Sequence, residues 1–413
     1  MKLPAWTLLV LSSVALASAG PATRPRYGGT LSVELSAPPD LTHPGTFTRL
    51  IAETLVRENE HGDLQPGLAT AWQHDAERKR WRFTLRPRVR FHDGHPLDAA
   101  SVVASLRVRH PDVTVTGAGQ VVTVASDRPL PGLLSELALP RCAIVRKNVA
   151  GLPIGTGPFR VTQGTVLTAF DDYWGGRPYL DAIHLRSGGP SRTTDVWEVP
   201  VGGTRRILPE RALLWSSQPA ELLAILLPAS VPDSIREALS LSIDRASIVN
   251  VLTQRQGEIS AALLPNWLTG YAFLFSTATD LPRARELVAA QKPGTLQLAY
   301  PAADPLARAV ADRIAVNARD AGLIVQPTPS ATPARLIRMR IESLDPTRAL
   351  QELAADLDLL DSLRPEAALQ SERSLLAGHR IIPLAHLPEI FALAPRVHYR
   401  GPVLRFEDVW LDP

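Results

Sequence analysis

Residues 80–106, "RWRFTLRPRVRFHDGHPLDAASVVASL", decide the fold of this chain. From residue 81 to residue 85 every second side chain is apolar, which predicts a strand with one buried face and one basic face in water. Asp93 and Gly94 then predict a turn, and Asp98 is a typical N-cap for the helix that follows. The stretch therefore predicts a strand, a turn and a helix in that order.

His92, Asp93 and His95 in the same stretch allow a second interpretation, a metal site. A stable site needs at least three protein ligands at a suitable spacing, and this spacing matches no strong metal signature. We therefore favour the turn and predict no metal and no permanent cofactor.

Composition limits the class of protein. The chain has 413 residues, of which 45% are hydrophobic and 21% are charged, and this predicts a globular protein of two or three domains. The formal net charge of +3 is too balanced to indicate a nucleic-acid partner.

The N-terminus predicts export. Lys2 precedes the apolar run "LPAWTLLVLSSVALASAG", whose h-region is too short to span a bilayer and which ends in the small residues Ala17-Ser18-Ala19. We expect a signal peptide at residues 1–19, cleavage after Ala19 and a periplasmic location. No cysteine follows the predicted cleavage site to accept a lipid, and Cys142, the only cysteine, has apolar neighbours that indicate a buried, inert thiol.

Strand-like and helix-like segments alternate along the chain, which favours an α/β protein whose lobes are built from discontinuous segments. The sequence predicts a strand at 30–35, a hairpin at 113–126, a helix at 235–253, a strand-helix-strand unit at 295–328, a mostly helical segment at 335–376 and strands from 381 onwards.

Catalytic motifs are missing from the sequence. It contains no Gly-x-Ser-x-Gly, no His-Glu-x-x-His and no Walker-type phosphate loop, and "GTGPF" at residues 155–159 lacks the lysine and the helix of such a loop. We therefore expect a binding protein and no enzyme. A secreted hydrolase whose site is assembled in space is the alternative.

The order of several motifs resembles the family 5 bacterial extracellular solute-binding proteins, the oligopeptide-, dipeptide- and nickel-binding proteins of ABC importers. The resemblance runs from about Tyr27 to the C-terminus of what looks like a shortened member, with apparent losses after Arg186 and between Thr328 and Ile381. The motifs are "YGGTLSVEL", "LVRENEHGDLQPGLATAWQHDAERKRWRFTLRPRVRFHDGHPLDAASVVASL", "GTGPFRV", "DDYWGGRPYLDAIHLR", "IREALSLSIDRASIVNVL" and "LPRARELVAA".

This resemblance implies the fold of type II periplasmic binding proteins: two α/β lobes joined by hinge crossover strands, plus the extra domain of the family. We expect a monomer that captures a peptide or small-molecule ligand by lobe closure and delivers it to an ABC permease and ATPase complex in the inner membrane. The expected segments are 27–48, 153–215 and 378–413 for lobe I, 49–152 for the small domain II and 216–377 for lobe III.

Candidate ligand residues also follow from the resemblance. Peptide binders of the family carry a Trp-x-Ala-Asp-Tyr-x-Asp-Pro-like motif, whose first Asp pairs with the α-ammonium of the peptide. The corresponding run here is "RMRIESLDP", which puts Glu342 where that Asp would lie and keeps Asp345 near the end of the motif. An exposed carboxylate at Glu342 and an N-cap at Asp345 are the alternatives.

Two further regions border the family's cleft. We expect ligand contacts from Thr42, His43 and Thr46 in the loop after the first strand, and aromatic stacking from Trp267 and Tyr271. The departures from the motif leave another interpretation open, a degenerate family member that acts as a partner-binding or chaperone-like module.

Overall fold

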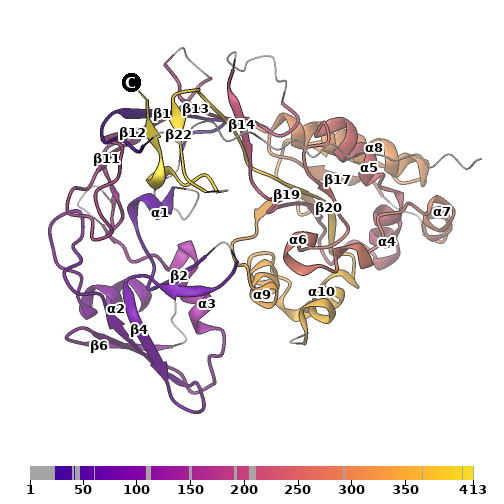
Figure 1. The fold of residues 1–413 in the computed structure, drawn as a ribbon. Coiled ribbons are helices and arrows are strands. Elements are labelled where there is room, and N and C mark those ends of the chain that lie inside the picture. The colour runs from indigo at the N-terminus through magenta and orange to yellow at the C-terminus, as the bar shows by residue number, and fades with distance from the viewer. Residues whose placement is uncertain are drawn as a thin grey trace, which may run out of the picture.

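A computed structural model shows three parts, each built around its own sheet (Figure 1). We call them lobe I, the small domain and lobe III. The predicted signal peptide lies outside the described residues. The structure describes residues 24–39, 41, 47–59, 61–107, 113–147, 151–189, 193–203, 211–291, 294–364, 366–401 and 403–412.

Lobe I contains a seven-stranded sheet. β1 lies in the middle of the sheet and pairs in parallel with β12 and β13, and its buried residues Leu31 and Val33 face the core of the lobe. In spatial order the strands are β10 (Phe159–Gln163), β11 (Val166–Ala169), β12 (Ala182–Ser187), β1 (Thr30–Leu35), β13 (Val196–Glu198), β21 (Ile390–Leu393) and β14 (Leu213–Ser216). Short elements around the sheet are α1 (Thr48–Ile51), β22 (Val397–His398), η6 (Phe406–Asp408) and β23 (Trp410–Leu411).

The small domain confirms the pattern of residues 80–106. Trp81, Phe83 and Leu85 are buried on β5, and the residues between them are exposed. A turn follows and α2 comes next, because Asp98 accepts a hydrogen bond from the Ser101 backbone N–H at 2.8 Å. The antiparallel sheet has the order β4 (Ala69–His74), β5 (Arg80–Leu85), β7 (Val121–Ala125), β6 (Thr114–Ala118). The other elements are β2 (Val56–Glu58), β3 (Leu64–Pro66), α2 (Ala99–Arg107), α3 (Leu133–Leu137), η1 (Pro140–Cys142), β8 (Arg146–Lys147) and β9 (Pro153–Ile154).

Lobe III has a six-stranded mixed sheet with helices on both sides (Figure 1). The predicted strand-helix-strand unit is confirmed, since β17 and β18 pair in parallel and α8 connects them before a turn at Gly322, whose φ is +86°. The strands, in spatial order, are β16 (Glu258–Ile259), β20 (Ile381–Leu387), β15 (Glu221–Leu226), β19 (Arg335–Arg340), β17 (Leu296–Ala299) and β18 (Val325–Thr328). The helical elements are α4 (Asp233–Ser242), α5 (Arg245–Ser247), η3 (Ile248–Leu252), α6 (Asn266–Thr269), η4 (Ala272–Leu274), α7 (Leu281–Ala289), α8 (Pro305–Asp320), α9 (Pro346–Asp356), η5 (Leu360–Ser362) and α10 (Ala368–Leu376).

The chain crosses between lobe I and lobe III twice, side by side. The first crossover joins β14 to β15 and the second joins β20 to β21, and the members of each pair belong to different sheets. The two crossovers are bonded to each other, because the Ser217 N–H donates to the Glu389 carbonyl and the Glu389 N–H donates to the Ser217 hydroxyl, both at 2.9 Å. This arrangement gives the molecule a two-stranded hinge.

Three expectations need correction. The return to lobe I comes after Leu387 and not at residue 378, because β20 pairs with β15 along its whole length. The segment 335–376 is not helical from its start, since β19 fills the centre of the lobe III sheet. The helix predicted at 235–253 breaks at Ile243, and Asp244 caps a new turn by accepting the Ser247 N–H at 3.0 Å.

Candidate functional site

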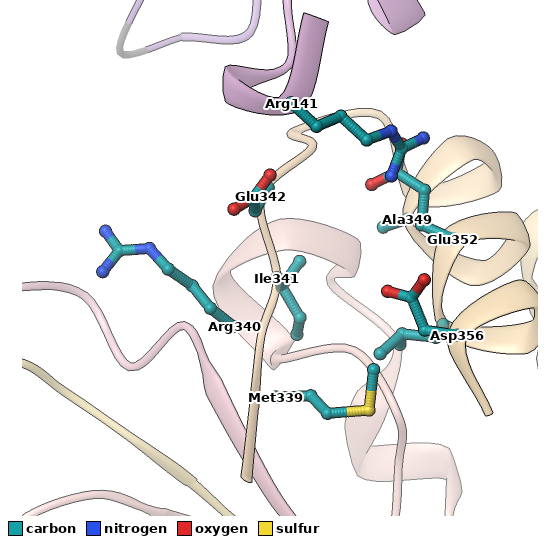
Figure 2. Close-up of a pocket in the computed structure, with 9 residues that line it drawn as sticks. Arg141, Met339, Arg340, Ile341, Glu342, Ala349, Glu352 and Asp356 are labelled. Carbon is teal, nitrogen blue, oxygen red and sulfur yellow. The ribbon is translucent and has the colours of Figure 1, made fainter. Parts of the chain in front are cut away.

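A hollow of about 280 Å³ lies where the small domain faces lobe III (Figure 2). One wall is the end of β19 with the residues after it, the other wall is α9, and Arg141 of the small domain reaches over from the opposite side. The lining combines apolar and charged side chains. Its members are Met339, Ile341, Ala349 and Leu353, together with Arg141, Arg340, Glu342, Glu352 and Asp356.

Glu342 reaches this hollow because the chain stays extended beyond β19. The Ile341 N–H donates to the Ala220 carbonyl at 2.8 Å, which continues the ladder between β19 and β15 for one more step. Ile341 and Ser343 are buried, at 6% and 1% exposure, whereas Glu342 between them is only partly buried. The alternation of an extended chain therefore presents the Glu342 side chain at the hollow.

The Glu342 carboxylate has no hydrogen bond or ion pair within the described part of the chain. Burial raises the pKa of this carboxyl above its usual value, even though nearby guanidinium groups act in the opposite direction. Those groups belong to Arg340, Arg141 and Arg49. A partly desolvated carboxylate without a hydrogen-bond donor is suited to accept a cationic group of a ligand.

The arginines of the hollow already have partners. Arg340 forms an ion pair with Glu389 at the hinge, and Arg141 lies 3.3 Å from Glu136 and 3.2 Å from Glu352. Because these guanidinium groups are engaged, Glu342 and Asp356 carry the charges that remain available to a ligand among the described residues lining the hollow.

Arg49 brings a charge from lobe I towards the same space. It lies on α1, and its pKa is lowered first by burial, with Arg405 and Arg340 adding to the effect. Arginine nevertheless stays charged in proteins. Because Arg49 acts on the pKa of Glu342, lobe I contributes to the electrostatics of a site whose walls come from lobe III.

The structure places the remaining predicted residues in different positions. Asp345 caps α9, because its Oδ1 accepts the Thr347 N–H at 2.9 Å and the Arg348 N–H at 3.2 Å. Trp267 donates its indole N–H to the Pro219 carbonyl, 3.0 Å away and next to the hinge. Ligand contacts by Asp345 and Trp267 stay predictions.

Tyr271 does not line the hollow at Glu342. Its hydroxyl is buried and faces the Glu372 carboxylate without a hydrogen bond of normal geometry, and burial raises the pKa of the phenol. Thr42, His43 and Thr46 lie outside the described residues, so the predicted contacts of that loop also stay predictions.

The His-Asp-Gly-His turn has a structural role. The His92 Nε2 atom lies 3.0 Å from the Gly157 carbonyl of lobe I, and its ring packs edge-on against Phe170. Burial lowers the pKa of His92 to about 4, so the ring is neutral at pH 7. Asp93 pairs with His95 at 3.1 Å and with Arg146 at 3.3 Å. These contacts confirm the predicted turn.

Sequence reasoning missed Arg141 and Glu352. The contact between them joins residues 211 positions apart, which no local pattern predicts. One signal was available: Arg348 and Glu352 are four residues apart, the spacing of an ion pair on one helix face, and they form such a pair at 2.8 Å.

Two features bearing on function are absent from the described residues. No helix there is long and apolar enough to cross a membrane. No three His, Cys, Asp or Glu side chains in the same residues converge as ligands for a metal ion.

Residues 63–197 match the family described as bacterial extracellular solute-binding proteins, family 5 middle. Over nearly the whole chain, the fold is similar to that of solved solute-binding proteins. The match covers about a third of the chain, and within that segment the chain resembles family 5 of the bacterial extracellular solute-binding proteins.

Solved structures resemble this chain in fold. DppA from Helicobacter pylori, described as an ABC transporter-associated periplasmic binding protein in complex with the peptide STSA, superposes with a TM-score of 0.78 at 17% identity and covers 94% of this chain and 99% of its own. NikA from Staphylococcus aureus in complex with Ni(L-His)₂ gives a TM-score of 0.74 at 19% identity, over 93% of this chain and 98% of its own. These likenesses confirm the predicted type II periplasmic binding protein fold.

Sequence relatives of this chain are of two kinds. The nickel-binding protein NikA of Staphylococcus aureus is 28% identical over 236 residues, which are 49% of this chain and 48% of the relative. The HTH-type transcriptional regulator SgrR of Escherichia coli strain K12 is 34% identical over 157 residues, which are 34% of this chain and 28% of the relative. The chain therefore spans about half of one relative and less than a third of the other.

Proposed function

We propose that this chain is a family 5 solute-binding protein, the exported component of an ABC importer that captures a peptide or a similar small polar organic solute by closing its lobes. The observation that carries the proposal is the hollow between separate bodies, where the Glu342 carboxylate has no hydrogen bond or ion pair to any residue that the structure describes. A ligand that touches both sides stabilises the closed arrangement, because its contacts exist only there.

The chemistry of the hollow favours a ligand with a cationic group. Glu342 accepts an ammonium of the ligand, and this charge-assisted hydrogen bond lowers the pKa that burial has raised. The apolar side chains of Met339, Ile341 and Leu353 pack against the carbon atoms beside that group. A peptide or amino-acid derivative with a free α-ammonium has this combination of features.

Delivery then needs a membrane partner. We propose that the loaded, closed form is recognised by an ABC permease and ATPase complex, and that the protein works in the periplasm after removal of residues 1–19. The fold similarity to the DppA structure, whose description names an ABC transporter and a bound peptide, supports this role.

A thermal-shift screen of the mature protein tests the function. The library contains di- and tripeptides with free or acetylated N-termini, together with nickel-histidine. We expect selected peptides with free N-termini to raise the melting temperature, since a ligand at a hundred times its Kd adds about 2.7 kcal/mol to stability. Stabilisation by acetylated peptides alone would contradict the role of Glu342, and a uniformly flat screen would contradict solute capture.

Glu342→Gln sharpens this test because it keeps the shape of the side chain and removes its charge. We expect an affinity loss of about 10- to 100-fold for the selected peptide. Glu77→Gln is the matched control, because Glu77 lies on the surface of the small domain. An unchanged affinity in Glu342→Gln would place the ammonium elsewhere.

A second candidate is a binding module that does not serve transport. The similarity to the SgrR regulators over 157 residues favours it, because proteins described as transcriptional regulators share this segment. Crosslinking in the periplasm distinguishes the two candidates. Crosslinking to an inner-membrane permease supports transport. If this protein binds a ligand but does not crosslink to any permease, the second candidate is supported.

A further inference from the structure

Four charged side chains join the small domain to lobe III in a closed ring of ion pairs. Glu136 of α3 and Arg141 of η1 come from the small domain, and Arg348 and Glu352 come from α9. Two contacts cross between the bodies, Arg348 to Glu136 and Arg141 to Glu352, the second at 3.2 Å. The other two stay within one body, Arg141 to Glu136 at 3.3 Å and Arg348 to Glu352 at 2.8 Å. We call these four residues the ion-pair ring.

The ring can open without leaving a charge unpaired. When the bodies separate, Glu136 keeps Arg141 and Glu352 keeps Arg348, because each body holds one complete pair. An unpaired buried charge would make separation costly, and the internal pairs avoid that cost. The ring therefore has two satisfied arrangements, closed as four residues or open as two pairs.

The interface around the ring is polar. The apolar core of the small domain and the core beneath α9 are separate clusters without a shared residue among those described. A further crossing contact is also polar and long, since the Leu344 N–H lies 3.5 Å from the Glu58 carboxylate. An interface without a common apolar core separates more easily than a domain core.

The small domain is, in contrast, fixed to lobe I. The Glu53 carboxylate, at the root of the small domain, accepts hydrogen bonds from Trp174 at 2.7 Å, Tyr173 at 3.0 Å and Thr156 at 3.0 Å, all from lobe I. The small domain therefore moves with lobe I. The hinge lies at the two crossovers, and Figure 1 shows them above the place where α3 faces α9.

We infer that the ion-pair ring is a latch, which holds the small domain against α9 when lobe I swings about the hinge. This inference deepens the proposed function, because Arg141 and Glu352 also line the hollow and the latch closes that side of it. The small domain then moves towards lobe III on closure, and the closed state has a stabilising contact that does not depend on the ligand.

Half-swaps of charge test the latch. Glu136→Arg with Arg141→Glu keeps the pair inside the small domain and the net charge, but turns both crossing contacts into repulsions. Arg348→Glu with Glu352→Arg does the same from lobe III. The full swap of all four residues restores attraction across the interface. We expect each half-swap to lower the ratio of closed to open molecules about tenfold, and the full swap to restore it.

The readout is a distance distribution in the ligand-free protein, so that it does not depend on solute capture. Spin labels at Glu77→Cys and Asp361→Cys report the separation of the small domain from lobe III, and the native Cys142, which is 1% exposed, stays unlabelled. Urea unfolding verifies that each variant is folded. A flat thermal-shift screen with an intact latch would overturn the proposed function and leave this inference standing.

The inference fails if both half-swaps keep the unmodified distance distribution, or if the full swap does not restore it. Salt offers a test without mutations. We expect molar NaCl to shift the unmodified protein towards the open distances, because salt screens the two crossing pairs. A distribution that is independent of salt would also overturn the latch.

Discussion

The small domain has two neighbours, and it contacts them in different ways. Against lobe I, the buried Glu53 carboxylate gathers hydrogen bonds from an indole, a phenol and a hydroxyl, and Arg57 completes the network. Arg86 stacks over the Trp174 ring, 4.1 Å from its centroid. Against lobe III, the contact is the ion-pair ring. If the junction with lobe I opened, Glu53 would lose its hydrogen-bond donors from lobe I. If the junction with lobe III opens, each side keeps one complete ion pair. The difference teaches that the small domain and lobe I move as one body, and that lobe III can separate from them.

Removal of the Glu53 carboxylate is the strongest test of this difference. Glu53 is only 6% exposed, and Glu53→Ala removes the common acceptor of Arg57 and of three polar side chains, so we expect a loss of about 3–5 kcal/mol in the free energy of unfolding. Urea unfolding followed by tryptophan fluorescence measures it. The control Glu77→Ala, with a mainly exposed carboxylate, changes stability by about 0.5 kcal/mol or less. A similar, small effect in both variants would mean that the junction with lobe I is not fixed by Glu53.

His92 lies at the junction with lobe I and is expected to make the stability of the protein depend on pH. The unfolded chain binds the proton near the ordinary pKa of 6.5 and the folded protein only near 4, so stability falls as the pH falls from 6.5 towards 4. The full shift corresponds to about 3 kcal/mol. We expect His92→Gln to flatten part of the pH dependence of urea unfolding. His386, whose pKa is also lowered to about 4, and His379, whose pKa burial lowers too, maintain a further part. His74→Gln, at an exposed position, is the control. Parallel curves for His92→Gln and the unmodified protein would contradict a neutral, buried His92.

The helix that carries the lobe III half of the ring has its own test. Asp345→Ala removes the cap of α9, and we expect a loss of about 1 kcal/mol in urea unfolding. Asp345→Asn keeps an oxygen acceptor for the Thr347 N–H and serves as the matched control. If Asn were as destabilising as Ala, the charge of Asp345 and not its capping bond would be the important property.

Arg348→Gln addresses the ring itself and has the smallest expected effect on stability, about 1 kcal/mol or less, because Glu136 and Glu352 both keep Arg141. The same variant shifts the ligand-free distance distribution towards open molecules. A stability loss as large as that of Glu53→Ala would show that both junctions are permanent, and the contrast between them would disappear.

The sequence predicted those parts of the fold whose pattern is local. Alternation placed Trp81, Phe83 and Leu85 on the buried face of β5, and Gly322 marked the end of α8. The pattern failed at β19, where three arginines in six residues do not look like a central strand. That strand is possible because Arg338 pairs with Glu221 and Arg340 with Glu389, and these partners lie far away in the sequence.

The candidate site was predictable to a similar extent. The family motif led to Glu342, which does line the hollow, because the extended chain after β19 is a local feature. Arg141 was not predicted, because its place at the hollow results from the packing of the small domain against α9. Packing between bodies leaves no periodic signal in either segment.

The two adjacent crossovers of the hinge bring the beginning and the end of lobe III together. Lobe III is one unbroken stretch of chain, and its first and last strands are antiparallel neighbours, with Glu221 beside Leu387. Its two ends therefore leave at the same point, as they do in a domain that has been inserted into a host. A short linker from Ser216 to Ile390, which already pair in the lobe I sheet, would therefore rejoin lobe I across the place where lobe III leaves it.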